Sequence, residues 1–290
     1  YVFGFSLKNM LVTEEYLYFF PNGRQAKIFE RDDKDFTTGS KFRGKLSTCK
    51  DVLKPNRLLL SCAANFSSVK EIEDAYKFFS DELVIYSSNN QDNWMQYSLY
   101  QINTNEEVKQ SVIRFMQNLG IGLRDIEVTI DQKKVEADEL PPFLDSKFKN
   151  IILQGNVDSI TVKVIYDGFE IDLMQEESTG VKKLFSLFCP LLDIIMNGKV
   201  LLCDELEAGL HESLVFELVR LFMEWESDNF PQIFFTTHET GLLNMDLFRR
   251  DQIWFTEKDE QTAATDLFSL YDFSIRKDTK VEKGYLIGRF

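Results

Sequence analysis

The sequence predicts an α/β fold in which a parallel sheet covered by helices accompanies an antiparallel β-subdomain. Apolar strands alternate with amphipathic helices between residues 199 and 237, and aromatic runs flank an Asn-Gly turn between residues 1 and 30. With 290 residues, 44% of them hydrophobic and 28% charged, the chain can form one large globular domain or two modest ones.

Charge and cysteine spacing exclude several functional classes. The 33 Lys and Arg residues against 47 Asp and Glu residues give a net charge of −14, so the surface as a whole repels nucleic acids and anionic membranes. The longest apolar stretch, residues 184–196, is interrupted by Ser186 and Asp193 and is shorter than the roughly 20 residues that span a bilayer. The four cysteines are far apart and form no CxxC pair, which predicts buried thiols and a cytoplasmic location.

The first half of the chain predicts strands followed by helices. A β-meander covers residues 1–30, and the polar stretch 31–45 predicts a loop. The S-x-x-E pattern that begins at Ser68 predicts a capped helix, and a second helix begins near Asn105 and stops at Gly120. We therefore expect an antiparallel β-subdomain over residues 1–50 and a helical or lid insertion over residues 51–150. The charged stretch from about 131 to 150 is either an insertion or a linker between lobes.

The second half, residues 151–290, predicts the main lobe. A hairpin turns at Asp167-Gly168, and a helix then runs to about Met196. The apolar strand KVLLC, an amphipathic helix over about 211–225 and the strand QIFFTT follow in the order expected of a parallel sheet. A last hairpin surrounds DEQTAAT.

The strongest chemical signal is VLLCDELEAGLHE, an apolar strand that ends in Asp204 and Glu205. Ligands gather at the carboxyl end of strands in open α/β sheets. Asp204 is suited to hold Mg²⁺ through its waters, and Glu205 to polarise a water that attacks a γ-phosphate. A strand end with two solvated acids is the alternative for this motif taken alone.

Two further segments favour the chemical interpretation. IFFTTHE is a second apolar strand and ends in His238, one of only two histidines in the chain, so an imidazole is predicted beside the carboxylates. In EESTGVKKLFSLFCP, Ser178, Thr179 and Gly180 precede a long helix, and Lys182 and Lys183 add positive charge. The first-turn amides of such a helix suit a phosphate, although Ser178 also suits an ordinary N-cap.

Together, these motifs resemble the nucleotide-binding heads of ABC-class ATPases of the OLD, RecF and SMC-like branch, close to bacterial AAA-type ATP-binding proteins of abortive infection and phage defence. ESTGVKKL resembles the signature motif, VLLCDE the Walker B motif, LEAGLH the D-loop and TTHE the switch histidine. The pattern RRDQIWFTEKD…LFSLYDF…EKGYLIGRF also resembles this group. Ser-Thr-Gly departs from the commoner Ser-Gly-Gly.

The resemblance implies the cofactors ATP and Mg²⁺ and a head-to-head homodimer or higher homo-oligomer. Glu205 and His238 would be catalytic and Asp204 would hold the metal. ATP-binding residues would be Ser178, Thr179, Gly180, Lys182, Glu207 and His211. The expected function is nucleotide-dependent assembly that controls an effector, a nuclease or toxin, in bacterial antiphage defence, with no membrane partner and direct DNA binding left open.

A phosphate loop of the form G-x-x-x-x-G-K-[ST] is not found in these residues. The nearest match runs from Gly39 to Leu46, where leucine replaces the hydroxyl residue that would bind Mg²⁺. We therefore expect the N-terminal segment that carries this loop to lie outside the chain, and the chain alone to turn over ATP negligibly.

Two other functions stay open. A RecF-like or SMC-like DNA-repair head would need a coiled-coil arm or a basic groove, and the first half offers no sustained heptads. A non-hydrolysing scaffold that uses ATP only for assembly would share the motifs but not depend on Glu205. Two histidines without an HExxH pattern argue against a metal hydrolase, and the absence of GxSxG argues against serine catalysis.

Overall fold

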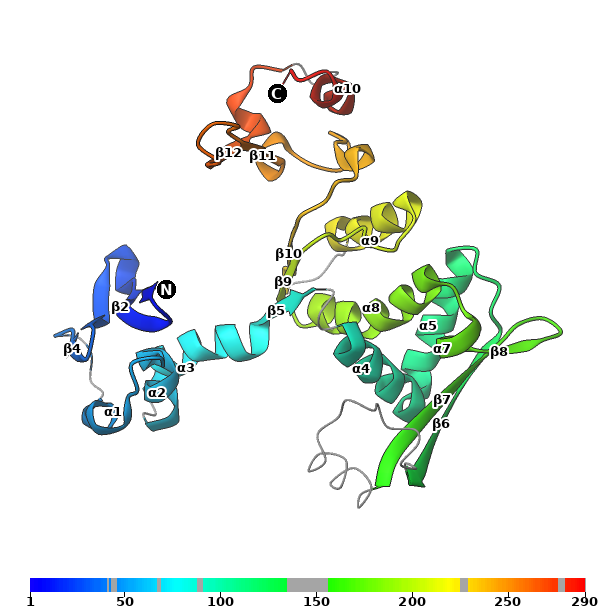
Figure 1. Ribbon diagram of the computed structural model, residues 1–290, viewed down its shortest axis with the longest axis horizontal. Coiled ribbons are helices and arrows are strands. Elements are labelled where there is room, and N and C mark those ends of the chain that lie inside the picture. Colours follow the sequence, from blue (N-terminus) through cyan, green and yellow to red (C-terminus); the bar gives the residue numbers. More distant parts are fainter. Residues whose placement is uncertain are drawn as a thin grey trace. The chain divides into compact units, whose positions relative to one another are not determined.

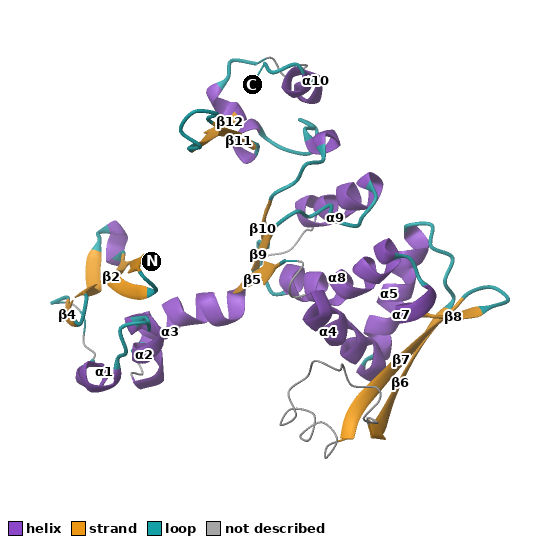
Figure 2. Cartoon of the chain, in the orientation of Figure 1, coloured by secondary structure: helices purple, strands orange, loops and turns teal. Residues whose placement is uncertain are grey.

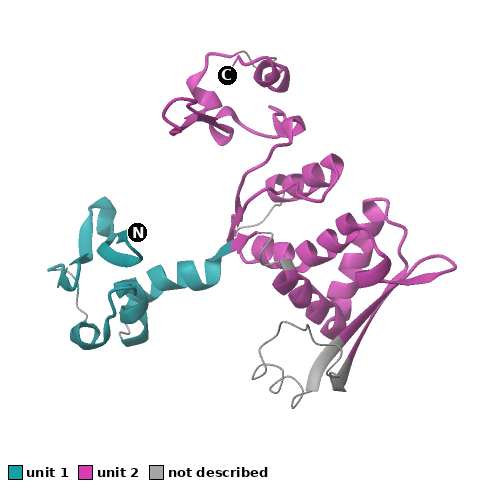
Figure 3. Ribbon diagram, viewed as in Figure 1, with its two compact units in different colours: residues 1–84 teal, residues 85–290 magenta. Residues whose placement is uncertain are grey.

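The computed structural model describes residues 1–40, 42, 46–66, 69–87, 91–134, 156–224, 229–275 and 280–289. The chain forms two compact units, residues 1–84 and residues 85–290 (Figure 3). Helices and strands are mixed throughout, as an α/β chain requires (Figures 1 and 2). The domain boundaries expected near residues 50 and 150 stay a prediction. None of the described helices is both long enough and apolar enough to cross a membrane.

The first unit begins with a four-stranded antiparallel sheet in the order β1-β2-β3-β4. This confirms the predicted meander, but the stretch 31–45 is not all loop, because it contains β4. Asp33 has a φ of +46° in the turn that brings Asp35 opposite Asp32, and the polar residues that follow form an edge strand exposed to water. The strands are β1 (Val2–Lys8), β2 (Leu11–Phe19), β3 (Ala26–Asp32) and β4 (Asp35–Thr38).

A buried ion pair anchors the start of α2 to the sheet. The Glu15 carboxylate, on β2, accepts the amide protons of Leu59 and Leu60 at 2.6 and 2.8 Å, at the start of α2. Arg31, on β3, lies 3.3 Å from the same carboxylate, and both side chains are buried. The helices are α1 (Ser47–Val52), α2 (Leu59–Phe66) and α3 (Lys70–Lys77).

The segments from Ser68 and Gly39 differ from their sequence patterns. Helix α3 confirms the helix predicted after Ser68, but its N-cap is Val69 without a side-chain bond, and Ser68 lies outside the described residues. The near-match from Gly39 to Leu46 lies between β4 and α1, and residues 41 and 43–45 are not among those described. Leu46 is buried in the core, so its side chain does not face a ligand.

The second unit packs helices on an antiparallel three-stranded sheet in the order β6-β7-β8. The predicted Asp167-Gly168 hairpin joins β7 to β8, and the core contains Val162 from β7 and Leu184 and Phe185 from α8. Most of the predicted insertion or linker over 131–150 lies outside the described residues. The strands are β6 (Asp125–Lys134), β7 (Asn156–Ile165) and β8 (Glu170–Asp172), and the helices are α4 (Gln91–Thr104), α5 (Glu106–Asn118), α7 (Leu173–Glu176) and α8 (Thr179–Met196).

The predicted start and end of the helix near residues 105 and 120 are confirmed. Asn105 accepts the amide protons of Glu107 and Val108, which begins α5 as predicted, and Gly120 has a φ of +80° just beyond its end. Helix α8 runs through Pro190 to Met196, so the proline does not end it.

In the second unit, β9 pairs with β10 in parallel as predicted, in a sheet of the order β10-β9-β5. Helix α9 connects these two strands. The predicted C-terminal hairpin is also present, and Phe255 stacks on Tyr285 of α10 with ring centroids 5.3 Å apart. The elements are β5 (Leu83–Tyr86), β9 (Val200–Cys203), α9 (Glu212–Glu224), β10 (Gln232–Phe235), β11 (Trp254–Lys258), β12 (Thr265–Ser269) and α10 (Val281–Leu286).

Candidate active site

The two parallel strands bring the predicted catalytic residues to one edge. The register pairs Val200 with Gln232 and Cys203 with Phe235, so β9 and β10 end at the same level. The segments that follow, beginning at Asp204 and Thr236, therefore leave the sheet side by side. Asp204 and Glu205 are exposed there, where a ligand can reach both carboxylates.

Thr236 joins the two carboxylate residues. Its hydroxyl donates to Oδ1 of Asp204 at 2.6 Å and accepts the amide proton of Glu205 at 2.9 Å. Its carbonyl accepts the amide proton of Leu206 at 3.1 Å. Glu205 has a φ of +49°, a left-handed conformation that is unfavourable for a side chain of this size. These bonds to Thr236 support Glu205 in that conformation.

His238 lies across from Glu205. Its Nε2 is 3.9 Å from Oε1 of Glu205, and the two side chains are 86% and 61% exposed. A pair this open is screened by water and contributes little to stability. Both groups are therefore free to turn toward a bound ligand.

Glu207 supports the segment that carries His238. Its Oε1 accepts the backbone amide proton of His238 at 2.8 Å. Burial works to raise the pKa of this carboxyl, but the bonds from His238 and the Thr237 hydroxyl outweigh it and lower the pKa below its usual value. Oε2 of Glu207 is buried and has no hydrogen-bond partner among the described residues. Glu207 thus holds the backbone beneath the imidazole, a contact that its predicted ATP-binding role did not include.

The start of α8 lies against the loop that follows Glu205. Ser178 is the N-cap, and its Oγ accepts the amide proton of Val181 at 3.2 Å. A Cβ added to Gly180 would lie 3.4 Å from the carbonyl oxygen of Gly209, and one added to Gly209 would lie 3.7 Å from Cγ2 of Thr179. Ser178 and Thr179 are exposed, so the helix start also faces solvent.

Two other predicted ATP-binding residues make local bonds. Nζ of Lys182 donates to the carbonyl oxygen of Met174 at 2.7 Å, at the start of α7. Nδ1 of His211 lies 2.9 Å from the hydroxyl oxygen of Ser213, just before α9. Neither side chain contacts Asp204, Glu205 or His238 through any bond seen in the described part of the chain.

Sequence reasoning missed three features of the site. Strand β5 was not predicted, although LVIY is a run of strand-forming residues, and the carbonyl of its Tyr86 accepts the amide proton of Asp204 at 3.4 Å. The bonding role of Thr236 was not predicted, since it depends on strand register. Lys183 of α8 is buried, and its Nζ reaches the loop that follows β9, whereas the sequence suggested only that it adds positive charge.

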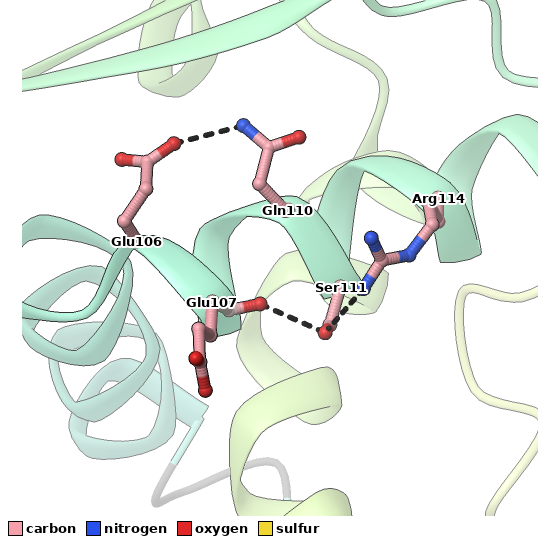
Figure 4. A pocket seen from close by; sticks show the side chains of 5 residues that line it. All are labelled: Glu106, Glu107, Gln110, Ser111 and Arg114. Atoms are coloured by element: carbon pink, nitrogen blue, oxygen red, sulfur yellow. Dashed lines mark hydrogen bonds between the residues drawn. The ribbon is translucent and has the colours of Figure 1, made fainter.

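Two surface pockets lie away from this edge. The pocket in Figure 4, of about 390 Å³, is formed along α5 by side chains from Glu106 to Arg114. There, Nε2 of Gln110 donates to Glu106 at 2.8 Å and Arg114 donates to the Ser111 hydroxyl at 3.1 Å. A second pocket, of about 680 Å³, lies between α5 and α9. Neither pocket contains a predicted site residue, so the candidate active site is the edge where β9 and β10 end.

Comparison with known proteins identifies the family. Residues 64–244, more than half of the chain, match the family described as "AAA domain, putative AbiEii toxin, Type IV TA system". The match includes β9, β10, the start of α8 and every predicted site residue. A comparison with curated proteins finds no match. The chain therefore belongs to this family of AAA domains, whose description connects it with abortive-infection toxins of toxin–antitoxin systems.

Proposed function

We propose that the chain forms the Walker B, signature and switch-histidine part of an ABC-type ATPase head of the OLD, RecF and SMC-like branch, which hydrolyses ATP with Mg²⁺. The observation that carries this proposal is the edge of β9 and β10, where Asp204, Glu205 and His238 meet around Thr236. Membership in an AAA-domain family supports ATP as the ligand.

The donor chemistry at this edge fits Mg²⁺. One oxygen of Asp204 accepts from Thr236, and the carboxylate is otherwise open to solvent. Among the residues that the structure describes, no three His, Cys, Asp or Glu side chains are grouped as a metal site. Mg²⁺ commonly takes one or two carboxylates and completes its shell with water and phosphate oxygens, so a single carboxylate is sufficient. Bound there, Mg²⁺ would neutralise charge on the phosphates.

Each residue at the edge then has a defined task. The Glu205 carboxylate accepts a proton from the attacking water, because it is 61% exposed and its backbone is bonded to Thr236. The His238 imidazole, free to turn above the Glu207-bound backbone, contacts the γ-phosphate. Asp204 holds the metal water shell.

The start of α8 supports assembly of two heads. Ser178 and Thr179 face solvent at a helix N-terminus, whose unpaired amides and dipole favour a phosphate. In a homodimer, this helix start would contact the γ-phosphate held by the other copy. ATP-dependent assembly would then control an effector, a nuclease or toxin, in antiphage defence, consistent with the toxin–antitoxin description of the family.

Replacing the proposed base tests the function. Glu205→Gln keeps the shape of the side chain and removes proton acceptance, so ATP turnover should fall about 10²- to 10⁴-fold while ATP binding is kept. The matched control is Glu224→Gln, which alters an exposed ion pair with Arg220 on α9. Turnover is measured with the intact protein, because residues 1–290 contain no G-x-x-x-x-G-K-[ST] loop and should be nearly inactive alone. Light scattering with ATP should show a persistent dimer for the Glu205→Gln protein. Turnover at the parental rate in that variant would refute the assignment.

A further inference from the structure

Lys183 occupies an unusual place for a lysine. It lies in the second turn of α8 and is only 3% exposed. Its Nζ donates to the carbonyl oxygen of Leu206 at 3.1 Å and to that of Ala208, and lies 5.6 Å from the centre of the Tyr86 ring. The two carbonyls and the ring face account for the three protons of the ammonium.

The buried ammonium of Lys183 and the carbonyls that it bonds depend on one another. A buried ammonium costs several kcal/mol unless hydrogen bonds compensate it, so a lysine persists here only with its partners. Burial lowers the pKa of Lys183 below its ordinary value, while Cys203, Glu207 and Glu205 partly oppose this change. An apolar side chain at this position would leave the Leu206 and Ala208 carbonyls without their donor.

The contacts of Lys183 complete the attachment of the loop over residues 205–209. Thr236 of the β10 segment holds one side through the amides of Glu205 and Leu206, and Lys183 of α8 holds the other through the carbonyls. Glu205, in its left-handed conformation, is held by Thr236 through its own amide and directly precedes Leu206, whose carbonyl accepts from Lys183. Gly209, at the end of the loop, lies near the start of α8, because a Cβ added to it would be 3.7 Å from Cγ2 of Thr179.

We propose that Lys183 is a positioning residue that clamps the loop 205–209 to α8, and so fixes Glu205 relative to the helix start at Ser178–Gly180. The clamp itself follows from contacts within the second unit, while its consequence for catalysis rests on the proposed ATPase function. If the assembly of two heads displaces the start of α8, the Lys183 ammonium would transmit that movement to Glu205.

Lys183→Met tests the clamp, with Lys183→Arg as the conservative variant. The matched control is Lys199→Met, which removes a partly buried lysine that bonds Asp193 at 2.7 Å near the other end of α8. Hydrogen exchange in the peptide covering residues 204–211 is measured in the intact protein. Lys183→Met should accelerate exchange there about tenfold, from the loss of bonds to a buried charge, and Lys199→Met should not.

The same variants separate positioning from ATP binding. We expect kcat to fall about tenfold in Lys183→Met with KM for ATP within about twofold, and Lys183→Arg to recover part of kcat. Unchanged exchange over 204–211, or accelerated exchange with parental kcat, would overturn the proposal. If Lys183→Met does not fold, Lys183→Gln, which removes the charge and shortens the side chain, takes its place with Lys199→Gln as the control. Faster exchange over 204–211 in Lys183→Gln than in Lys199→Gln supports the clamp, and parental exchange overturns it. If Lys183→Met accelerates exchange over 204–211 but the parent protein hydrolyses no ATP, the clamp is supported and the proposed ATPase function is refuted.

Discussion

Thr236→Val removes a single hydroxyl from the strand edge and nearly preserves the shape of the side chain. In the parent, this hydroxyl donates to Asp204 at 2.6 Å and accepts the amide proton of Glu205 at 2.9 Å. Valine is also branched at Cβ, so it keeps the stiffness of the strand end. The substitution therefore acts on these two bonds and on the left-handed backbone of Glu205 that they support.

The expected magnitude follows from the exposure of the site. A hydrogen bond to a charged group contributes about 1.5–3 kcal/mol and a neutral one about 0.5–1.5 kcal/mol. Because Asp204, Glu205 and Thr236 are exposed, water replaces part of both, and the lower ends of these ranges apply. The sum is about 2 kcal/mol, which corresponds to about a 30-fold lower ATP turnover rate if Glu205 must keep this conformation in the transition state.

The assay is steady-state phosphate release by the intact protein, with a thermal melt of each variant. Thr236→Ser is the matched control, because it keeps the hydroxyl and should stay within about threefold of the parent. A Thr236→Val protein with parental turnover would refute the reasoning. So would a serine variant as slow as the valine variant, because the lost methyl group rather than the hydroxyl would then be responsible.

Two further predictions concern the second unit. Gly180→Ala should leave the melting temperature unchanged or slightly higher, because alanine stabilises a helix by about 0.5–1 kcal/mol over glycine and the added Cβ would lie 3.4 Å from the Gly209 oxygen. ATP turnover should nevertheless fall if the backbone of Gly180 approaches a phosphate of the other copy, and unchanged turnover would argue against that contact. Asp125 lies 2.7 Å from Nζ of Lys109; burial opposes ionisation of its carboxyl, but the bonds from Lys109 and the Ile126 amide lower its pKa below the ordinary 3.8. The ion pair stabilises the fold at pH values above the ordinary pKa of aspartate, and this stabilisation is lost as the pH falls through the lowered pKa of Asp125. Asp125→Asn should therefore lower the free energy of unfolding by about 0.5–1 kcal/mol near pH 7 and leave it unchanged near pH 2. Urea unfolding at both pH values checks this, and an equal deficit at both would contradict it.

Local patterns allowed much of the fold to be predicted. The Asn-Gly turn, the Asp167-Gly168 hairpin and the Asn105 cap depend on neighbouring residues, and the structure confirms each of these elements. Strand β4 was missed because an exposed edge strand needs no apolar side chains. Strand β5 was missed because four residues between helices carry little periodicity.

In the candidate site, too, features that depend on local sequence could be predicted and features that depend on long-range contacts could not. Asp204, Glu205 and His238 could be placed from sequence, because each lies within three residues of the end of an apolar strand and parallel strands end at one edge. The roles of Thr236 and Lys183 could not, because each depends on contacts with segments more than 20 residues away in the chain. A lysine beside a signature-like motif suggests a ligand contact, and only the structure shows that the buried Lys183 bonds the loop after β9 instead.

Lys182 and Lys183 both bond carbonyl oxygens, so the positive charge that ATP needs beside Asp204 and Glu205 must come from other groups. Lys183 bonds backbone carbonyls and Lys182 bonds Met174, so neither ammonium is directed at Asp204 or Glu205. A triphosphate that approaches two exposed carboxylates on a chain of net charge −14 meets repulsion unless cations intervene. Mg²⁺ at Asp204 and the helix start of a second copy are the two sources that the proposed mechanism supplies. Productive ATP binding should therefore require both together, so nucleotide binding and head assembly are expected to be thermodynamically coupled.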